Sequence, residues 1–510
     1  MTNSLRTSPH GEAITRILAA AINAVDPSAA VIRNMRSRGQ KLIIGEQSYD
    51  LNEYQRILIF GFGKASVPMM DATANILGDK LTTGIAITKS AAGSAYINEA
   101  FHRRADGTKY NKFTTGIAVT KSAAGSDYIA SDEAFHRSTP GMLREADGTR
   151  YHHAQITIMP ASHPVPDERG VQAAKRIIEI LQTTTPADLV IFLISGGGSA
   201  LLTAPVPAIS LNDLQSLTSS LLACGAEIAE INTLRKHLSQ VKGGHLTRHA
   251  HPAKTVCLIL SDVIPNVIGD RLDVIASGPT VPDPSTYADA IEIIAKYSLT
   301  PKIPASILAH LRRGAAGDIP ETPKADDPVF ERVQNIIVGN NLQAAQAAAA
   351  QARKENFNAI LLTTRIKGEA NQVGPFLAAI GHQIASSGDP IPRPACVIAG
   401  GETTVTLAAQ HSGLGGRNQE VALSAVNELA GLPNVMLITL ATDGDDGPTD
   451  AAGAVVTGQT LERAQALGLL PNDFLARNDS YHFFEQLGDL LQPGPTQTNV
   501  NDLNFIFVFG

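Results

Sequence analysis

The sequence predicts the α/β class, with two lobes that each contain a largely parallel sheet flanked by helices. Three observations support this prediction. Short apolar segments alternate with helix-like segments along most of the chain, which is the pattern of parallel α/β proteins. The apolar segments are continuous, as in strands buried on both faces. A stretch rich in glycine, proline and acidic residues at 315–327 interrupts the pattern, which then restarts.

In the first half, helical spacing of isoleucine and leucine predicts an amphipathic helix at residues 13–24. Asp167 suits the N-cap of a helix at 168–181. The other expected helices are one ending near residue 77 and those at 211–248 and 287–297. The expected strands lie at 55–60, 81–89, 155–159, 188–194 and 255–260.

The second half repeats the alternation. The expected strands lie at 335–338, 358–363, 395–399 and 435–440, and the expected helices at 342–354, 369–386 and 417–429. We therefore predict an N-terminal Rossmann-like domain at residues 1–320 and a C-terminal α/β domain at 330–510.

A tandem duplication occupies residues 82–151. Residues 82–103 begin TTGIAITKSAAG, and residues 114–137 begin TTGIAVTKSAAG. Two copies are too few for a solenoid, and one sheet position cannot hold both. We expect the first copy to lie in the sheet, because its link from the preceding helix is short, and the second to be a surface insertion. A recent duplication or a gene-model error is favoured over a new binding surface.

Composition narrows the function classes. The chain has 510 residues and a net charge of −7 without a long basic run, which argues against nucleic acid and anionic membranes as partners. Its three cysteines are far apart, so neither disulfides nor a zinc site is indicated. No apolar run reaches the roughly 18–20 residues that span a bilayer, and no secretory pattern is seen. We expect a cytoplasmic protein.

One glycine-rich turn stands out. The apolar run DLVIFLI ends in Ser195, Gly196, Gly197, Gly198 and Ser199, and a helix-like sequence follows. Consecutive glycines let backbone N–H groups approach a ligand, and a loop that opens onto a helix N-terminus favours anions. The first hypothesis is a phosphate-binding loop; the alternative is a plain strand-to-helix turn.

Polar, glycine-flanked residues also follow other predicted strands, where open α/β sheets bind ligands. They are Lys64 in GFGKAS, Asp262 in SDV, Glu402 in GGETT, and Asp443, Asp445 and Asp446 in TDGDDG. Each has an ordinary explanation alone. Together, cations, glycine loops and carboxylates favour phosphoryl transfer, in which carboxylates hold Mg²⁺ and cations neutralise phosphate oxygens.

Rival readings are weaker. GFGKAS has Ser66 at the third glycine position of a dinucleotide fingerprint, and the next strand ends in Lys89 rather than an acid. Neither a Walker A motif nor a GxSxG elbow is present. A non-catalytic sugar- or phosphate-sensing module stays open as an alternative.

The motifs occur in an order that resembles the glycerate 2-kinase family, whose C-terminal region is the MOFRL domain. They are GFGKAS, ASHPVPDERG, SGGGSALL, INTLRKHLSQVKGGHL, SDV, IASGPT, GGETTVT, GLGGRNQE, ATDGDDGPTDAAGA and GPTQTNVNDL. The likeness extends from about residue 12 to 509. Some members carry a hydroxypyruvate reductase label, so an NAD(P)H-dependent reductase is the alternative activity, beside a non-catalytic module that binds a small anion.

The resemblance implies transfer of the ATP γ-phosphoryl group to the 2-hydroxyl of D-glycerate, giving 2-phosphoglycerate, in a cleft between two α/β lobes. Lys64 and Arg417 match the family's lysine and arginine, and Asp262 is a candidate base or metal partner. The implied nucleotide-binding residues are Ser195, Gly196, Gly197, Gly198, Ser199 and Glu402, and the implied Mg²⁺ ligands are Asp443 and Asp446. A homodimer is an open expectation. Two departures stand out: TKSAAG replaces TKYGHG, and Gln497 replaces a glycine.

Overall fold

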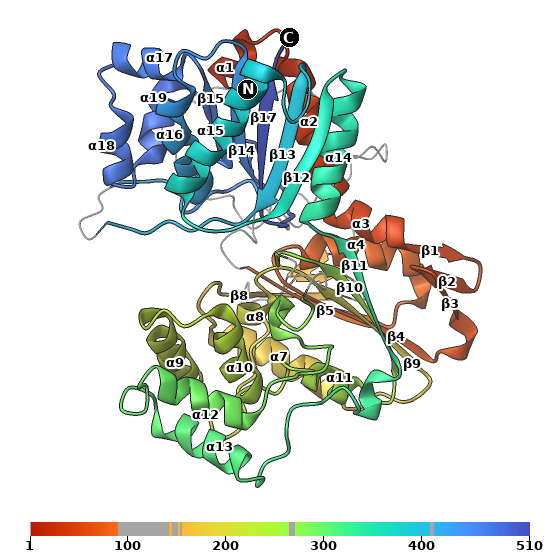
Figure 1. Cartoon of the computed structure of the whole chain (residues 1–510). Helices are drawn as coiled ribbons and strands as arrows, with labels where there is room; N and C mark the ends of the chain where they lie inside the picture. Colours follow the sequence, from red (N-terminus) through yellow and green to blue (C-terminus); the bar gives the residue numbers. More distant parts are fainter. Residues whose placement is uncertain (1, 90–141, 145–150, 154–155, 265–270, 409–412) are drawn as a thin grey trace.

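The computed structural model describes the chain except for residues 1, 90–141, 145–150, 154–155, 265–270 and 409–412. It shows two lobes, each built on a sheet with helices on its faces (Figure 1). The two-lobe α/β class is confirmed. Within the described part of the chain, no single helix is long and apolar enough to cross a membrane; α2 (Gly11–Ala24) and α3 (Pro27–Asn34) pass that test only together, with a 58° bend between them.

The first lobe contains an eight-stranded sheet in the order β11-β10-β9-β4-β5-β8-β7-β6. The strands from β11 to β8 are parallel, and β7 and β6 are antiparallel additions. Their bounds are β4 Arg56–Phe62, β5 Thr83–Lys89, β6 Met142–Arg144, β7 Tyr151–His153, β8 Ile156–Ala161, β9 Asp188–Ile194, β10 Lys254–Leu260 and β11 Val333–Gly339. Because these parallel strands end at one edge, the turns after β4, β9 and β10 meet there.

Helices cover both faces of this sheet, with α4 (Ser66–Leu77) in one apolar cluster and α7 (Glu168–Leu181) in another. A separate helical cluster contains α9 (Leu211–Ala223), α10 (Ile228–His237), α12 (Tyr287–Lys296) and α13 (Ala305–Ala315). The helix expected at 211–248 is thus divided into α9, α10 and α11 (His245–Ala250). Gly225, with positive φ, lies in the break after α9, and Gly243 and Gly244, also with positive φ, lie in the break before α11.

The duplication is only partly described. The start of the first copy, Thr83–Lys89, forms β5 between β4 and β8, as expected. The second copy lies outside the described residues. A small antiparallel sheet of β1 (Met35–Arg38), β2 (Lys41–Ile44) and β3 (Gln47–Asp50) flanks this lobe.

The second lobe has a six-stranded sheet in the order β12-β13-β17-β14-β15-β16. The bounds are β12 Asn358–Ile366, β13 Ala395–Gly401, β14 Val435–Ala441, β15 Gly453–Thr457, β16 Leu490–Leu491 and β17 Asp502–Val508. Only β12 and β13 pair in parallel, and β17 is antiparallel to both neighbours. The expectation of a largely parallel sheet is wrong here, because β17 enters the centre without the crossover helix that a parallel strand needs.

The helices of this lobe lie on both faces. One side carries α14 (Asn341–Lys354), and the other carries α15 (Ala370–Ser387) and α16 (Arg417–Leu429). Three short helices, α17 (Thr460–Ala466), α18 (Pro471–Ala476) and α19 (Ser480–Leu487), complete it.

The N-terminal helices join the two lobes. Figure 1 shows α1 (Asn3–Thr7) and α2 beside the second sheet, and α2 packs on α14. The Ser4 backbone N–H and hydroxyl both donate to the fully buried Asp489, at 2.8 Å each. One apolar cluster includes α2, α14 and residues of both sheets. The lobes therefore share part of their core.

Candidate active site

The turns after β4 and β9 are bonded to each other. The Ser195 hydroxyl accepts the backbone N–H of Ala65 at 3.0 Å, and the Lys64 N–H donates to the Gly196 carbonyl at 2.9 Å. Gly63 permits this contact: its φ is +125°, and a Cβ there would lie 2.2 Å from the Ser195 hydroxyl oxygen. The lysine turn and the glycine turn thus form one unit, and the buried Ser195 has a structural partner.

An ion pair crosses the interface between the lobes at this unit. The Lys64 ammonium lies 3.2 Å from the Asp443 carboxylate, which follows β14 of the second sheet. The two side chains are 30% and 23% exposed, so a ligand can reach them. The sequence-predicted lysine and aspartate therefore face each other.

Asp262 follows β10 and lies against the glycine turn. A Cβ on Gly196 would be only 2.2 Å from its carboxylate, so a larger residue at position 196 would displace the Asp262 side chain. Burial raises the pKa of Asp262 to about 6, and the charge of Glu402 adds to the increase, whereas Lys64 opposes it. Since Glu402 belongs to the second lobe, carboxylates from both lobes converge near Lys64.

Arg417 begins α16 and is held by two acids of the second sheet. Its guanidinium lies 2.5 Å from Glu402 and 2.6 Å from Asp502. Burial raises the pKa of Asp502 to about 7, and the Arg417 charge opposes this. Asp502 was not singled out from the sequence. It lies at the start of β17 without flanking glycines, and its only signal was its place in the GPTQTNVNDL motif.

Asp446 lies nearby, but N–H groups of the protein already bond to both of its carboxylate oxygens. Its carboxylate accepts the backbone N–H groups of Asn418 and Gln419 at 3.1 and 2.9 Å and the Asn418 amide at 3.2 Å. Burial raises its pKa to about 6, although these donors favour the anion. It therefore anchors the first turn of α16, where N–H groups lack helical partners. Asp443 keeps an accessible carboxylate. Over the described ranges, no three His, Cys, Asp or Glu side chains form a metal-binding group.

The SGGGS turn opens onto a short helix. Gly197 has φ +82°, and the helix that follows, α8 (Gly198–Leu201), is a single turn. Pro205 and Pro207 follow soon after it in the chain. The N–H groups of Gly196 and Gly197 have no acceptor among the described residues.

Two loops lie beside this turn, one with His163 and the other with Ser277. Both belong to motifs recognised in the sequence, but their residues were not predicted as site residues. The His163 ring lies 3.1 Å from where a Gly197 Cβ would be. Burial, followed by the charges of Lys64 and Lys89, lowers the pKa of His163 to about 4, so the ring is neutral at pH 7. On the other side, the Ser199 hydroxyl contacts that of Ser277 at 2.9 Å, and Ser277 donates to Asn232 at 2.9 Å.

The fold and the site define a class: two-lobed α/β proteins that gather a lysine, an arginine and carboxylates at facing strand ends. Family models agree. A model described as a domain of unknown function (DUF4147) matches residues 13–312, and the MOFRL family model matches residues 395–502.

Named relatives specify the family. The D-glycerate 2-kinase of Thermotoga maritima is 43% identical over 362 residues, 70% of this chain and 82% of that protein. The glycerate 2-kinase of Pyrococcus horikoshii is 35% identical over 96% of this chain and 95% of its own. A protein of Agrobacterium vitis with the provisional name hydroxypyruvate reductase is 44% identical over 71% of this chain and 80% of its own.

A solved structure agrees with these relatives. The crystal structure of Thermotoga maritima glycerate kinase superposes with a TM-score of 0.74 at 35% identity, covering 97% of this chain and 98% of that one. The chain belongs to the glycerate 2-kinase family.

Proposed function

We propose that this protein is an ATP-dependent kinase that transfers the γ-phosphoryl group to the 2-hydroxyl of D-glycerate and forms 2-phosphoglycerate. The observation that carries the proposal is the contact of Lys64 with Asp443 across the lobes, next to Asp262 and the glycine turn. The names of the relatives support the choice of donor and acceptor.

In the proposed reaction, the 2-hydroxyl oxygen forms a bond to the γ-phosphorus. The bond between that phosphorus and the β–γ bridging oxygen breaks, and ADP leaves. The hydroxyl proton passes to the Asp262 carboxylate. A pKa of about 6 leaves Asp262 ionised at neutral pH but basic enough to accept a proton.

Lys64 and Arg417 are proposed to neutralise the charge that spreads over the transferring group. Phosphoryl transfer depends on such positioning and electrostatic stabilisation. Arg417 is suited to this role because Glu402 and Asp502 fix its guanidinium from two sides. Glu402 is thereby a positioning residue for Arg417 as well as a predicted contact to the nucleotide.

The nucleotide and Mg²⁺ fit parts of the predicted set. The free N–H groups of Gly196 and Gly197 suit phosphate oxygens. Asp443 has the accessible carboxylate that Mg²⁺ needs, whereas both oxygens of Asp446 accept N–H groups. Mg²⁺ uses one or two protein carboxylates together with phosphates, and when bound it neutralises charge on the β- and γ-oxygens. We retain Asp443 as its ligand.

We also propose a cytoplasmic enzyme that acts on small molecules, in line with the net charge of −7 and the scattered cysteines. The division into domains at 1–320 and 330–510 remains part of this proposal, although β11 (Val333–Gly339) pairs with β10 in the sheet of the first lobe. In it, Lys64 and Asp262 come from the first domain, and Arg417, Glu402 and Asp443 from the second.

The test is direct. Purified protein is incubated with D-glycerate, ATP and MgCl₂, and ADP release is followed, with the position of the phosphate determined by ³¹P NMR. We expect ADP and 2-phosphoglycerate, and no ADP when EDTA replaces MgCl₂. Oxidation of NADH with hydroxypyruvate, in the absence of ADP release, would instead identify a reductase.

A further inference from the structure

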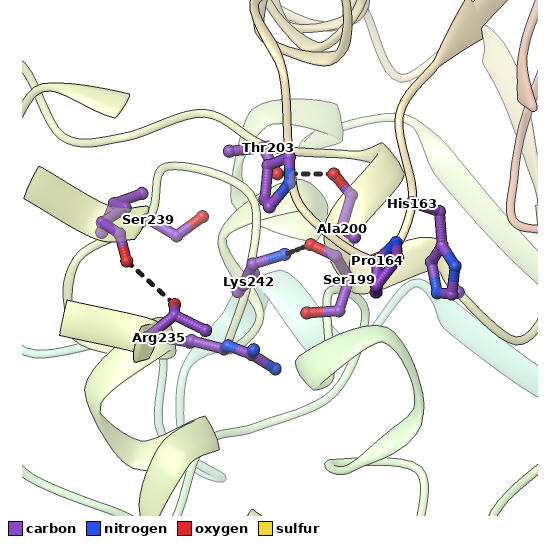
Figure 2. Close-up of a pocket in the computed structure, with 12 residues that line it drawn as sticks. His163, Pro164, Ser199, Ala200, Thr203, Arg235, Ser239 and Lys242 are labelled. Atoms are coloured by element: carbon purple, nitrogen blue, oxygen red, sulfur yellow. Dashed lines mark hydrogen bonds between the residues drawn. The ribbon is translucent and has the colours of Figure 1, made fainter. Parts of the chain in front are cut away.

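A cavity of about 190 Å³ lies beside the SGGGS turn and is lined in part by Gly197, Ser199 and Ala200. Figure 2 shows Arg235 and Lys242 on one side of it, Ser199 and Ala200 at its centre and His163 with Pro164 on the other. Its other lining groups include the hydroxyls of Thr203, Thr218 and Ser239. No acidic residue is among the described residues that line it.

Arg235 lacks a counter-ion within the described part of the chain. Burial alone lowers its pKa, and no carboxylate offsets this. Its neighbours on α10 differ: Lys236 lies 3.2 Å from Asp283, and His237 lies 3.1 Å from Glu321. The nearby acids thus pair with Lys236 and His237, and Arg235 lines the cavity without a carboxylate partner among the described residues.

Lys242 is a second cation without an acid. It is buried, and its ammonium donates to the carbonyls of Ser199 and Leu202 at 2.6 and 3.1 Å. Burial, followed by the charge of Arg235, lowers its pKa to about 7. Two desolvated cations near each other cost folding free energy unless an anion joins them.

The cavity adjoins the proposed reaction centre. The position of a Gly197 Cβ is 3.1 Å from the His163 ring and 3.5 Å from the Lys64 side chain, so the Lys64 side chain lies against a glycine that lines the cavity. Sites for drug-sized ligands occupy about 300–1,000 Å³, so this volume suits a small acid better than a whole nucleotide.

We propose that this cavity is the subsite for the small hydroxy acid, with the acceptor's carboxylate bound by Arg235 beside Lys242. The inference rests on the proposed function and specifies where its acceptor lies. Ser199 and Ser239, whose hydroxyls bond to Ser277 and to the Val241 N–H, line the same cavity. An oxyanion here completes the hydrogen bonding of Arg235, which no protein acceptor does in the described residues.

The test measures binding without turnover. D-glycerate is titrated by calorimetry into the full-length protein without nucleotide, for wild type, Arg235→Gln, Arg235→Lys and the exposed control Arg312→Gln. We expect Arg235→Gln to weaken binding about 10- to 100-fold, Arg235→Lys to weaken it less, and Arg312→Gln to match wild type. In steady state, the KM for D-glycerate should rise while that for ATP stays within twofold.

Unchanged D-glycerate affinity in a folded Arg235→Gln protein overturns the subsite. So does a rise in the KM for ATP alone, which assigns the cations to nucleotide phosphate. If Arg235→Gln does not fold, Arg235→Lys carries the test, and D-glycerate affinity equal to wild type in that variant also overturns the subsite. D-glycerate binding that depends on Arg235 without ADP release supports the subsite and refutes the kinase.

Discussion

The Lys64 ammonium and the Asp443 carboxylate lie 3.2 Å apart although 379 residues separate them in the chain. One follows β4 of the first sheet and the other follows β14 of the second. Partly exposed ion pairs of this kind contribute about 1 kcal/mol or less to stability. The contact is therefore more informative about function than about folding, because it places a cation and an acid from different lobes at one accessible point.

Replacing Lys64 with Ala should lower kcat about 10²- to 10³-fold, the usual cost of removing one group that stabilises transition-state charge. The melting temperature should change little, since the ion pair is partly exposed. Coupled ADP-release kinetics and thermal unfolding measure both effects. The exposed Lys80→Ala protein is the control, and wild-type turnover in Lys64→Ala would remove Lys64 from the mechanism.

The proposed base predicts the pH profile. Asp262 must be ionised to accept the hydroxyl proton, so kcat/KM should fall as pH decreases through about 6. Asp262→Asn should abolish this limb together with most of the activity. A mutant that keeps both the rate and the acidic limb would assign the base elsewhere.

The same shift has a consequence for stability. Burial raises the folded-state pKa of Asp262 above its ordinary value of 3.8, so the folded protein binds this proton more tightly than the unfolded chain. This tighter proton binding stabilises the fold fully at pH below 3.8, and the stabilisation is lost as pH rises through about 6. Asp262→Asn should therefore be more stable than wild type at pH 8, as chemical denaturation can show, and equal or lower stability there would contradict the cause assigned to the shift.

Two of the three acids of TDGDDG, Asp443 and Asp446, should respond differently to substitution. Asp446→Ala leaves the Asn418 and Gln419 N–H groups without their acceptor and should cost about 1–3 kcal/mol of unfolding free energy. Asp443→Asn should instead raise the MgCl₂ concentration needed for half-maximal rate. Denaturant unfolding measures the free energy of unfolding, and Mg²⁺ titrations measure the MgCl₂ concentration at half-maximal rate. A raised Mg²⁺ requirement in Asp446→Asn, with normal stability, would restore Asp446 as a metal ligand.

Gln497 adopts φ +66°, a left-handed conformation that costs a residue with a Cβ about 1–2 kcal/mol. The departure from glycine at this position thus carries backbone strain. Gln497→Gly should stabilise the protein by up to about 1 kcal/mol, because the flexibility of glycine in the unfolded chain offsets part of the gain. Thermal unfolding measures the stability of Gln497→Gly. The control is Gln492→Gly, a second glutamine-to-glycine change that should not stabilise the protein. A loss of stability in Gln497→Gly would show that other interactions compensate the backbone strain.

Sequence reasoning located the strand ends well because apolar runs and glycines are local signals. Helix α16 begins at Arg417 and α7 at Glu168 with Asp167 as N-cap, as expected. The sequence pattern could not predict the insertion of β17 into the middle of the sheet, since strand order depends on pairing between distant segments. For the same reason Asp446 looked like Asp443 in the sequence, and only the tertiary contact with α16 separates a helix anchor from an accessible acid.

The place of β17 also bears on how the second lobe assembles. This strand joins β13 to β14, yet it follows every other strand of its sheet in the chain. Without residues 502–508, β12 and β13 have no strand that pairs them with β14, β15 and β16. The sheet of the second lobe therefore closes only when this strand is in place, and its deletion removes the middle of the sheet rather than an edge strand.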